Sequence, residues 1–420
     1  MTGLALGGFL AAGMPIAFAL IAATFAFMLA SSDMRLLEAL PQIMFGSIEI
    51  FDLLAIPLFI LLGELMNEGG MTRRIVGATR AWLFRVKNSL AYVCLLANLI
   101  LAAIMGSAVA QIAVMSRVMV PEMEKDGYDR GFASALTASA GLLGPIIPPS
   151  MPFIIYGVVG QVSVADMFAG GILPGLMLFG FMCLFIAFAG SRPNAGAPGA
   201  PPTMAERLKI SAEALATLAI PFVIVGGISA GLVTPTESAA IAVAVAIIVG
   251  GFFYRELRFS DLAGILDRTA ANTATVLFLI VAAKLFGWVL TFNQVPQATA
   301  GFLQSLTDNP ILFMLLVFLI LNVVGMFLDG IAALIILVPI LLPIATGAYG
   351  IDPVHFGIMM CLTLILGLLT PPVGAGLFIA SSINGISVVT LSRLLLPFVL
   401  MTALVILAVI VFPVLTRPFG

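Results

Sequence analysis

The stretches GLLGPIIPPS (141–150) and GLLTPPVGAG (367–376) decide the fold, because each places a Pro-Pro pair in the middle of an apolar segment. Proline lacks a backbone N–H donor and clashes with the carbonyl one turn earlier, so each helix must break there. A break at membrane depth frees carbonyl oxygens, which suit a small hard cation, and leaves a half-helix N-terminus, which suits a carboxylate. A structural kink satisfied by Ser and Thr hydroxyl groups is the alternative for one break. Two breaks at related positions favour the functional interpretation.

The two breaks belong to an internal repeat. Gly367 follows Gly141 by 226 residues, and Pro235 follows Pro15 by 220 residues. The order of features agrees in both halves: a span, an arm, a span, a hairpin, a broken span and a span. We therefore expect a first repeat over 1–189, a cytoplasmic linker rich in Pro, Gly and Ala over 190–210, and a second repeat over 211–420.

Composition places this repeat in a lipid bilayer. Of 420 residues, 62% are hydrophobic and 9% are charged, whereas a soluble globular chain is about 25% charged. The sequence therefore predicts an all-α polytopic membrane protein. A net charge of −2 without a basic tract argues against a nucleic-acid partner, and three scattered cysteines and one histidine argue against a disulfide framework or a His/Cys metal site. We expect no enzyme activity, because no nucleophile with an adjacent base is visible.

Two apolar stretches, 89–120 and 311–345, are too long for one crossing and carry glycine and polar residues near the middle. We expect both to be re-entrant hairpins, which enter and leave by one face with their tips inside the protein. One long kinked helix or two ordinary spans is the alternative for each. Broken helices are expected over 131–156 and 353–381, and amphipathic arms over 33–47 and 255–270.

Basic residues predict the orientation of the spans. If the basic segment 71–88 is cytoplasmic, 15 of the 18 Lys and Arg residues fall on that side, and Arg35, Lys284 and Arg417 are the exceptions. This topology places the first arm outside and the second arm inside, and it opens the first hairpin inward and the second outward. The two repeats are then inverted, as in many secondary transporters, whose substrate sites lie near the midplane between the repeats.

Repeat symmetry predicts two cation sites, each between a hairpin tip and a break, with an anion pocket between them. Most cation ligands would be main-chain oxygens, which is why Gly, Ile and Val can contribute. The first cation site is expected at Gly106, Ser107, Gly141, Gly144 and Ile147, and the second at Gly325, Asp329, Gly367, Thr370 and Val373. The substrate is expected at Ser107, Ser150, Asp329 and Thr370.

Three charged residues are expected at membrane depth, where an ionised side chain costs at least about 2.5–3.5 kcal/mol on insertion scales. Asp329 would serve the ion or substrate site, or would cap a helix of the second hairpin. Glu64 and Lys284 hold equivalent places in the two repeats and would pair across the interface in a structural role. A proton relay is the alternative for that pair.

Four stretches resemble the large membrane subunit, the DctM-like component, of tripartite ATP-independent periplasmic (TRAP) transporters. They are IFDLLAIPLFILLGELMNEGGMTRRIV (50–76), GLLGPIIPPS, TPTESAA (234–240) and GLLTPPVGAGLFIA (367–380), and the resemblance covers essentially the whole chain. The N-terminal segment is shorter than the family pattern. The extra spans of fused family members are not seen, so the chain resembles a separate M subunit.

The resemblance implies an elevator-type symporter of the ion transporter superfamily. It implies Na⁺-coupled uptake of an organic acid of the dicarboxylate, keto acid or sialic acid class, with two or more Na⁺ as coupling ions. The hairpins and broken helices would form a transport domain, and the rest a scaffold. A periplasmic solute-binding protein (P) and a small four-helix membrane subunit (Q) are the implied partners, in the bacterial inner membrane. A proton-coupled organic acid carrier, with Asp329 and Glu64 as titratable residues, is the alternative.

Overall fold

Backbone groups inside a bilayer must be hydrogen-bonded within the protein, and helices satisfy them within one segment. The structure, a computed structural model, describes residues 2–31, 36–84, 86–189 and 202–417, and in these ranges the regular elements are all helices. Seven described helices are long and apolar enough to cross a membrane, or eight if a bent pair of helices is counted as one span. The protein is therefore an all-α, multi-pass membrane protein.

The first repeat contains ten α-helices in its described residues. They are α1 (Thr2–Ala11), α2 (Ile16–Ser31), α3 (Leu36–Gly46), α4 (Ala55–Glu68), α5 (Met71–Leu83), α6 (Ser89–Met105), α7 (Ala108–Lys125), α8 (Arg130–Ala140), α9 (Met151–Gly160) and α10 (Val164–Ala189). Short 3₁₀ turns, η1 (Phe51–Leu54) and η2 (Gly141–Leu143), precede α4 and follow α8.

The second repeat follows the same order. Its helices are α11 (Met204–Ser229), α12 (Pro235–Ile248), the π-turn η3 (Val249–Phe253), α13 (Phe259–Phe292), α14 (Val295–Leu306), α15 (Pro310–Phe327), α16 (Gly330–Gly347), α17 (Pro353–Gly367), α18 (Ala375–Asn384), α19 (Val388–Val411) and η4 (Pro413–Thr416). The two hairpins, α6–α7 and α15–α16, and the two broken helices, α8–α9 and α17–α18, confirm the fold predicted from the Pro-Pro and Gly patterns.

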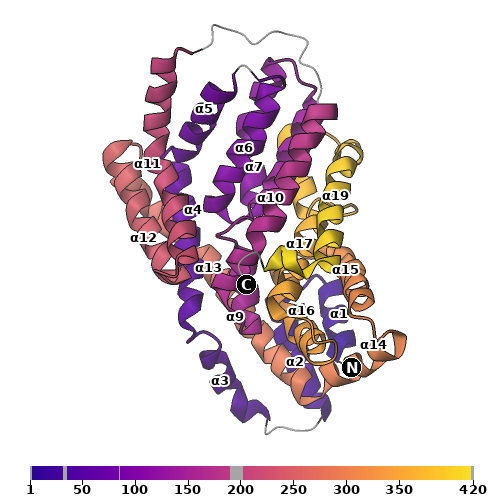
Figure 1. Ribbon diagram of the computed structural model, residues 1–420. Helices are drawn as coiled ribbons and strands as arrows, with labels where there is room; N and C mark the ends of the chain where they lie inside the picture. Colours follow the sequence, from indigo (N-terminus) through magenta and orange to yellow (C-terminus); the bar gives the residue numbers. More distant parts are fainter. Residues whose placement is uncertain (1, 32–35, 85, 190–201, 418–420) are drawn as a thin grey trace.

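The hairpins approach from opposite ends of the molecule. Figure 1 shows α5, α6 and α7 in its upper half and α14, α15 and α16 in its lower half. The first hairpin turns at Gly106, whose φ of 56° is left-handed and suits glycine, and Ser107 then caps α7. This turn excludes a single kinked helix. The opposite placement of the hairpins is the arrangement that an inverted repeat requires.

The predicted arms and linker differ in detail from the helices. In the first arm, residues 33–35 lie outside the described residues, and α3 meets the helical stretch Phe51–Glu68 at an angle of 58°. The second arm, 255–270, is not separate from its span: α13 runs for 34 residues without a proline to break it. In the linker, residues 190–201 lie outside the described residues. Residues 204–210 begin α11, because Thr203 and Glu206 form a capping box.

The two broken helices pack directly on each other through a glycine. A Cβ on Gly357 of α17 would lie 2.2 Å from the ring of Tyr156 of α9, and the Tyr156 hydroxyl donates to the Pro353 carbonyl at 2.7 Å. Small residues of this kind let helices approach closely in a bilayer, where van der Waals packing rather than hydrophobic burial drives association. The contact joins the broken helices of both repeats into one packed unit.

Candidate functional site

The first break is held by its own serine. Ser150 caps α9: its Oγ accepts a hydrogen bond from the Phe153 N–H at 3.3 Å and donates to the Pro145 carbonyl at 2.5 Å. Ser150 is fully buried, so both contacts are shielded from water. The hydroxyl thus satisfies backbone groups that the break has freed. This is the structural role given above as the alternative to ion binding at such a kink.

The tip of the first hairpin touches this break. The Met151 N–H donates to the Gly106 carbonyl at 3.4 Å. A Cβ on Gly141 would lie 2.5 Å from Ile112 Cγ1, and one on Gly144 would lie 2.5 Å from Gln111 Oε1. Both glycines therefore allow the close approach of α7. The structure places Gly106 beside Pro149 and Met151, and places Gly141 and Gly144 beside Ile112 and Gln111.

The second break has the same architecture with different groups. A Cβ on Gly367 would lie 2.5 Å from the Gly325 carbonyl carbon, so only glycine fits at the crossing of α15 and α17. The Gly374 N–H donates to the Met326 carbonyl at 3.0 Å, and Thr370 Oγ1 donates to the Leu366 carbonyl at 2.8 Å. Gly325 and Gly367 therefore meet, while the Thr370 hydroxyl is bonded to its own helix.

Asp329 caps a hairpin helix, which was one of the two roles expected from its sequence position, and it also lies at a cavity. Its Oδ2 accepts from the Ile331 N–H at 3.0 Å and from the Ala332 N–H at 3.5 Å, which caps α16. Its side chain also lines the cavity described next. An ionised carboxylate at a helix N-terminus is stabilised by the helix dipole, so the cap also explains how a charge is accommodated here.

A cavity of about 560 Å³ is lined by residues from the central parts of both repeats. From the hairpins and broken helices it is lined by Met105–Ala110, Ala113, Val114, Pro145, Met151, Pro152, Asp329–Ile331, Ile365 and Leu368. From α4 and α13 it is lined by Phe59, Ile60, Gly63, Glu64, Asn67, Asn272, Thr275 and Val276. The cavity therefore lies between the packed hairpin unit and the two long helices α4 and α13.

The N-termini of three helices open onto this cavity. Ser107 and Ala108 begin α7, Met151 and Pro152 begin α9, and Gly330 begins α16. The positive end of a helix dipole favours an anion at such a point. Several of the first-turn N–H groups already have partners, because Ser107, Ser150 and Asp329 each cap their helix. Among the described residues that line the cavity, none is Lys or Arg. An anion bound here would therefore be held by the helix dipoles and by the polar side chains of the wall.

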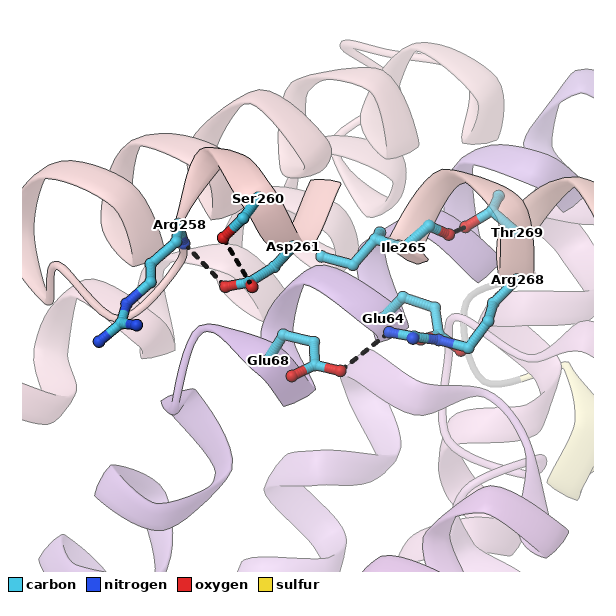
Figure 2. Close-up of polar contacts among 8 residues, drawn as sticks. All are labelled: Glu64, Glu68, Arg258, Ser260, Asp261, Ile265, Arg268 and Thr269. Carbon is cyan, nitrogen blue, oxygen red and sulfur yellow. Dashed lines mark hydrogen bonds and ion pairs between the residues drawn. The ribbon is translucent and has the colours of Figure 1, made fainter. Parts of the chain in front are cut away.

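The charged wall residue Glu64 is neutralised by an arginine that the repeat symmetry did not indicate. Arg268 of α13 contacts Glu64 of α4 at 2.7 Å and Glu68, one turn further, at 2.9 Å, as Figure 2 shows. The predicted Glu64–Lys284 pair is wrong, because Lys284 donates instead to the Val159 carbonyl at 2.9 Å. Arg268 ties α4 to α13, and Lys284 ties α13 to the C-terminal end of α9.

The predicted site residues separate into two groups. Gly106, Ser107 and Asp329 line the cavity, whereas the others lie behind it or away from it. Ile147 lies against α10, where a Cβ on Gly175 would come within 2.4 Å of its Cδ1, and Val373 is 43% exposed. The predicted substrate residues Ser107 and Asp329 thus line one cavity, whereas Ser150 and Thr370 are not among its lining residues.

Sequence reasoning missed the polar residues on the α4 and α13 side of the cavity. Asn67, Asn272 and Thr275 line the wall, and no Pro or Gly break marks them in the sequence. Within the described residues, no group of three His, Cys, Asp or Glu side chains is placed to hold a metal ion. A cation at either break would therefore depend on main-chain, hydroxyl and amide oxygens, which suit a hard cation of low charge.

Inverted repeats whose hairpins and broken helices meet at one cavity are the architecture of secondary transporters. Residues 4–415 match the family model for the "Tripartite ATP-independent periplasmic transporter, DctM component". The chain belongs to this family.

Named relatives agree with the family over nearly the full length of the chain. The sialic acid TRAP transporter large permease protein SiaM of Vibrio cholerae is 37% identical over 410 residues, covering 97% of this chain and 95% of that protein. The C4-dicarboxylate TRAP transporter large permease protein DctM of Pseudomonas aeruginosa is 35% identical, covering 88% and 86%. The crystal structure of the Alcanivorax borkumensis YdaH transporter is similar in fold, with a TM-score of 0.64 at 17% identity, covering 90% of this chain and 87% of that one.

Proposed function

We propose that this protein is a Na⁺-coupled permease that takes up an organic acid delivered by a periplasmic solute-binding protein. The observation that carries the proposal is the cavity of about 560 Å³ at which three helix N-termini from both repeats converge. Relatives are named for sialic acid, 2,3-diketo-L-gulonate and C4-dicarboxylates, all of which are organic acids. A carboxylate at the N-termini of α7, α9 and α16 fits this substrate class.

The coupling ions would bind on the far side of the hairpin tips, at the two breaks. The ligands of the first ion would be carbonyl oxygens of the first break and of the Gly106 turn. The ligands of the second ion would be carbonyl oxygens near Gly367 and Thr370. Two Na⁺ carried with a monoanion move one net positive charge, and each such charge contributes about 2.3 kcal/mol per 100 mV. A dianion would require a third cation for the membrane potential to help.

The geometry supports an elevator mechanism. The hairpins and broken helices form one packed unit through Tyr156 and Gly357, while Arg268 joins α4 and α13 into a second body. The cavity lies between the two bodies, so movement of the hairpin unit past α4 and α13 would carry the substrate with it. The Lys284–Val159 hydrogen bond crosses this boundary and must break during such a movement.

The proposed partners are a small membrane subunit, which would complete the scaffold, and the solute-binding protein. One relative, the isethionate permease protein DctMQ of Oleidesulfovibrio alaskensis, matches 98% of this chain over only 65% of its own length. Its name and its additional length fit a permease with both membrane subunits in one chain. For the present chain we propose the same pairing with a small membrane subunit in the inner membrane.

The test is uptake in proteoliposomes that contain this chain and its small membrane subunit, with added binding protein. Radiolabelled C4-dicarboxylates, sialic acid and keto acids are offered in turn, with an inward Na⁺ gradient or with choline replacing Na⁺. We expect accumulation of one class only when Na⁺ is present outside. Uptake indifferent to Na⁺ would contradict the proposal, and uptake driven by a pH gradient in Na⁺-free buffer would establish the proton-coupled alternative.

A further inference from the structure

The first hairpin contains a buried amide that no helix contact satisfies. Gln111 of α7 is fully buried, and its Oε1 has no hydrogen-bond donor among the described residues. Leaving a buried acceptor unpaired costs about 1–3 kcal/mol, and orphaned groups of this kind require an explanation. Val109, Ala110 and Ala113 of the same helix line the substrate cavity, whereas Gln111 does not. Its amide therefore faces away from the substrate and toward the first break.

A second buried amide fixes the direction of the orphaned oxygen. Gln111 Nε2 donates to the Asn98 carbonyl at 2.7 Å and to Asn98 Oδ1 at 2.9 Å. The Asn98 amide is itself anchored, since its Nδ2 donates to the Cys94 carbonyl at 2.8 Å. A rotated Gln111 amide would place Oε1 against two acceptors, so the observed orientation is the one that the hairpin enforces.

The oxygen points at the first break. The position of a Cβ on Gly144 lies 2.5 Å from Gln111 Oε1 and 3.2 Å from the Gly141 carbonyl oxygen. Two acceptor oxygens therefore flank the same side of Gly144, which has no side chain to fill the space. The Gly141 carbonyl accepts the Gly144 N–H at 3.2 Å and keeps a second lone pair, whereas Gln111 Oε1 has no donor among the described residues. A cation would stabilise the unpaired oxygen, and amide and carbonyl oxygens are ligands of hard cations. Because these oxygens carry no net charge, they favour a monovalent ion.

We propose that Gln111, oriented by Asn98, supplies a side-chain oxygen to the coupling Na⁺ at the first break. This inference rests on the Na⁺ coupling proposed above and adds a residue that the repeat symmetry does not indicate. Counting from the helix caps, Ser107 and Asp329, the equivalent position in the second hairpin is Ala333, which offers no such oxygen. The two cation sites are therefore chemically unequal, and the first has the additional ligand.

The experiment measures Na⁺-dependent thermal stability of the chain purified with its small membrane subunit. Melting temperature is recorded against NaCl concentration, with choline chloride keeping the ionic strength constant. Gln111→Leu removes the oxygen at similar volume. Asn98→Ala removes Oδ1, one of the two acceptors that orient the Gln111 amide, and leaves the main-chain carbonyl of residue 98. Thr402→Val is the matched control, because Thr402 is buried and donates only within its own helix, to the Phe398 carbonyl at 2.9 Å.

We expect Gln111→Leu to raise the Na⁺ concentration at half-saturation about tenfold or more, which corresponds to 1.4 kcal/mol or more. Asn98→Ala should raise it about threefold or more. Thr402→Val should lower the melting temperature in choline chloride without changing the Na⁺ concentration at half-saturation. A purely structural Gln111 would behave like this control.

Wild-type half-saturation in both Gln111→Leu and Asn98→Ala would overturn the inference and leave the proposed Na⁺ coupling intact. If Gln111→Leu does not fold, an unchanged Na⁺ half-saturation in Gln111→Ala, which also lacks the oxygen, overturns the inference. A wild-type protein whose melting temperature and uptake both ignore Na⁺ would overturn the inference together with the proposed function.

Discussion

Removing the Arg268 guanidinium should expose the substrate to an uncompensated carboxylate. Arg268 is the cation that contacts Glu64 at 2.7 Å, and Glu64 lines the cavity with its side chain 24% exposed. In Arg268→Leu, Glu64 would remain in the cavity wall without that partner. Two carboxylates one helical turn apart, Glu64 and Glu68, would also repel each other.

The cavity volume gives the size of the effect. A roughly spherical space of about 560 Å³ is about 10 Å across, so an anion at its centre lies about 5–8 Å from a wall carboxylate. At an effective dielectric constant of about 20, two unit charges at that separation interact by about 2–3 kcal/mol. Because Glu64 is partly exposed and therefore screened, we take the lower value. The substrate concentration at half-maximal uptake should rise about 30-fold.

The assay is initial uptake of the transported acid at saturating Na⁺, with Arg268→Leu, Glu64→Gln and the double variant compared in parallel. We expect the double variant to return within about threefold of wild type, because it lacks both the charge and its partner. Equal half-saturation in wild type and Arg268→Leu would refute the reasoning. A double variant as impaired as Arg268→Leu would show that the arginine acts through packing of α4 on α13 instead of through charge.

Three further predictions follow from contacts elsewhere in the chain. Gly367→Ala should lower the melting temperature by the equivalent of about 1–3 kcal/mol, because its Cβ would lie 2.5 Å from the Gly325 carbonyl carbon. Gly347→Ala is the control, since the space around Gly347 is open, and it should not lower the melting temperature. Equal effects of the two substitutions would contradict the close crossing of α15 and α17. Ser107→Ala and Thr370→Ala should raise the Na⁺ concentration needed for half-maximal uptake, and unchanged values in both would contradict the assignment of those hydroxyl groups to the cation sites. Burial raises the pKa of Glu256, but Arg74 and Arg73 outweigh it and hold that pKa below its ordinary value of 4.5. The stabilising contribution of Glu256 is therefore complete above about pH 4.5 and is lost as the pH falls through the lowered pKa. Glu256→Gln should flatten the dependence of melting temperature on pH in that range. An unaltered curve would count against the ion pairs of Glu256 with Arg73 and Arg74.

Local backbone chemistry explains why the breaks and hairpins were predictable. A Pro-Pro pair inside an apolar segment forces a break wherever the segment lies, and the glycine at the first hairpin tip adopts a left-handed φ of 56°. The position of the second break against Gly325 follows from the same repeat. These features depend on a few adjacent residues, so the sequence alone indicates them.

Side-chain partners depend on the path of whole helices and were less predictable. The repeat relates Glu64 to Lys284, but α13 is one unbroken helix, and Lys284 lies 16 residues beyond Arg268 on it. At 1.5 Å per residue that separation is about 24 Å, so Glu64 reaches only Arg268. The orientation of Gln111 likewise depends on Asn98 in the preceding helix, a contact that no spacing within α7 indicates.

Coupling between the organic acid and Na⁺ is the central claim, and it is tested most directly by measuring ion movement driven by the substrate. Proteoliposomes with this chain, its small subunit and the binding protein are prepared with equal ²²Na⁺ inside and outside and with the membrane potential clamped. An inward gradient of the transported acid should then drive net ²²Na⁺ accumulation, since coupling acts in both directions. Uptake of the acid with no accompanying ²²Na⁺ would contradict the account.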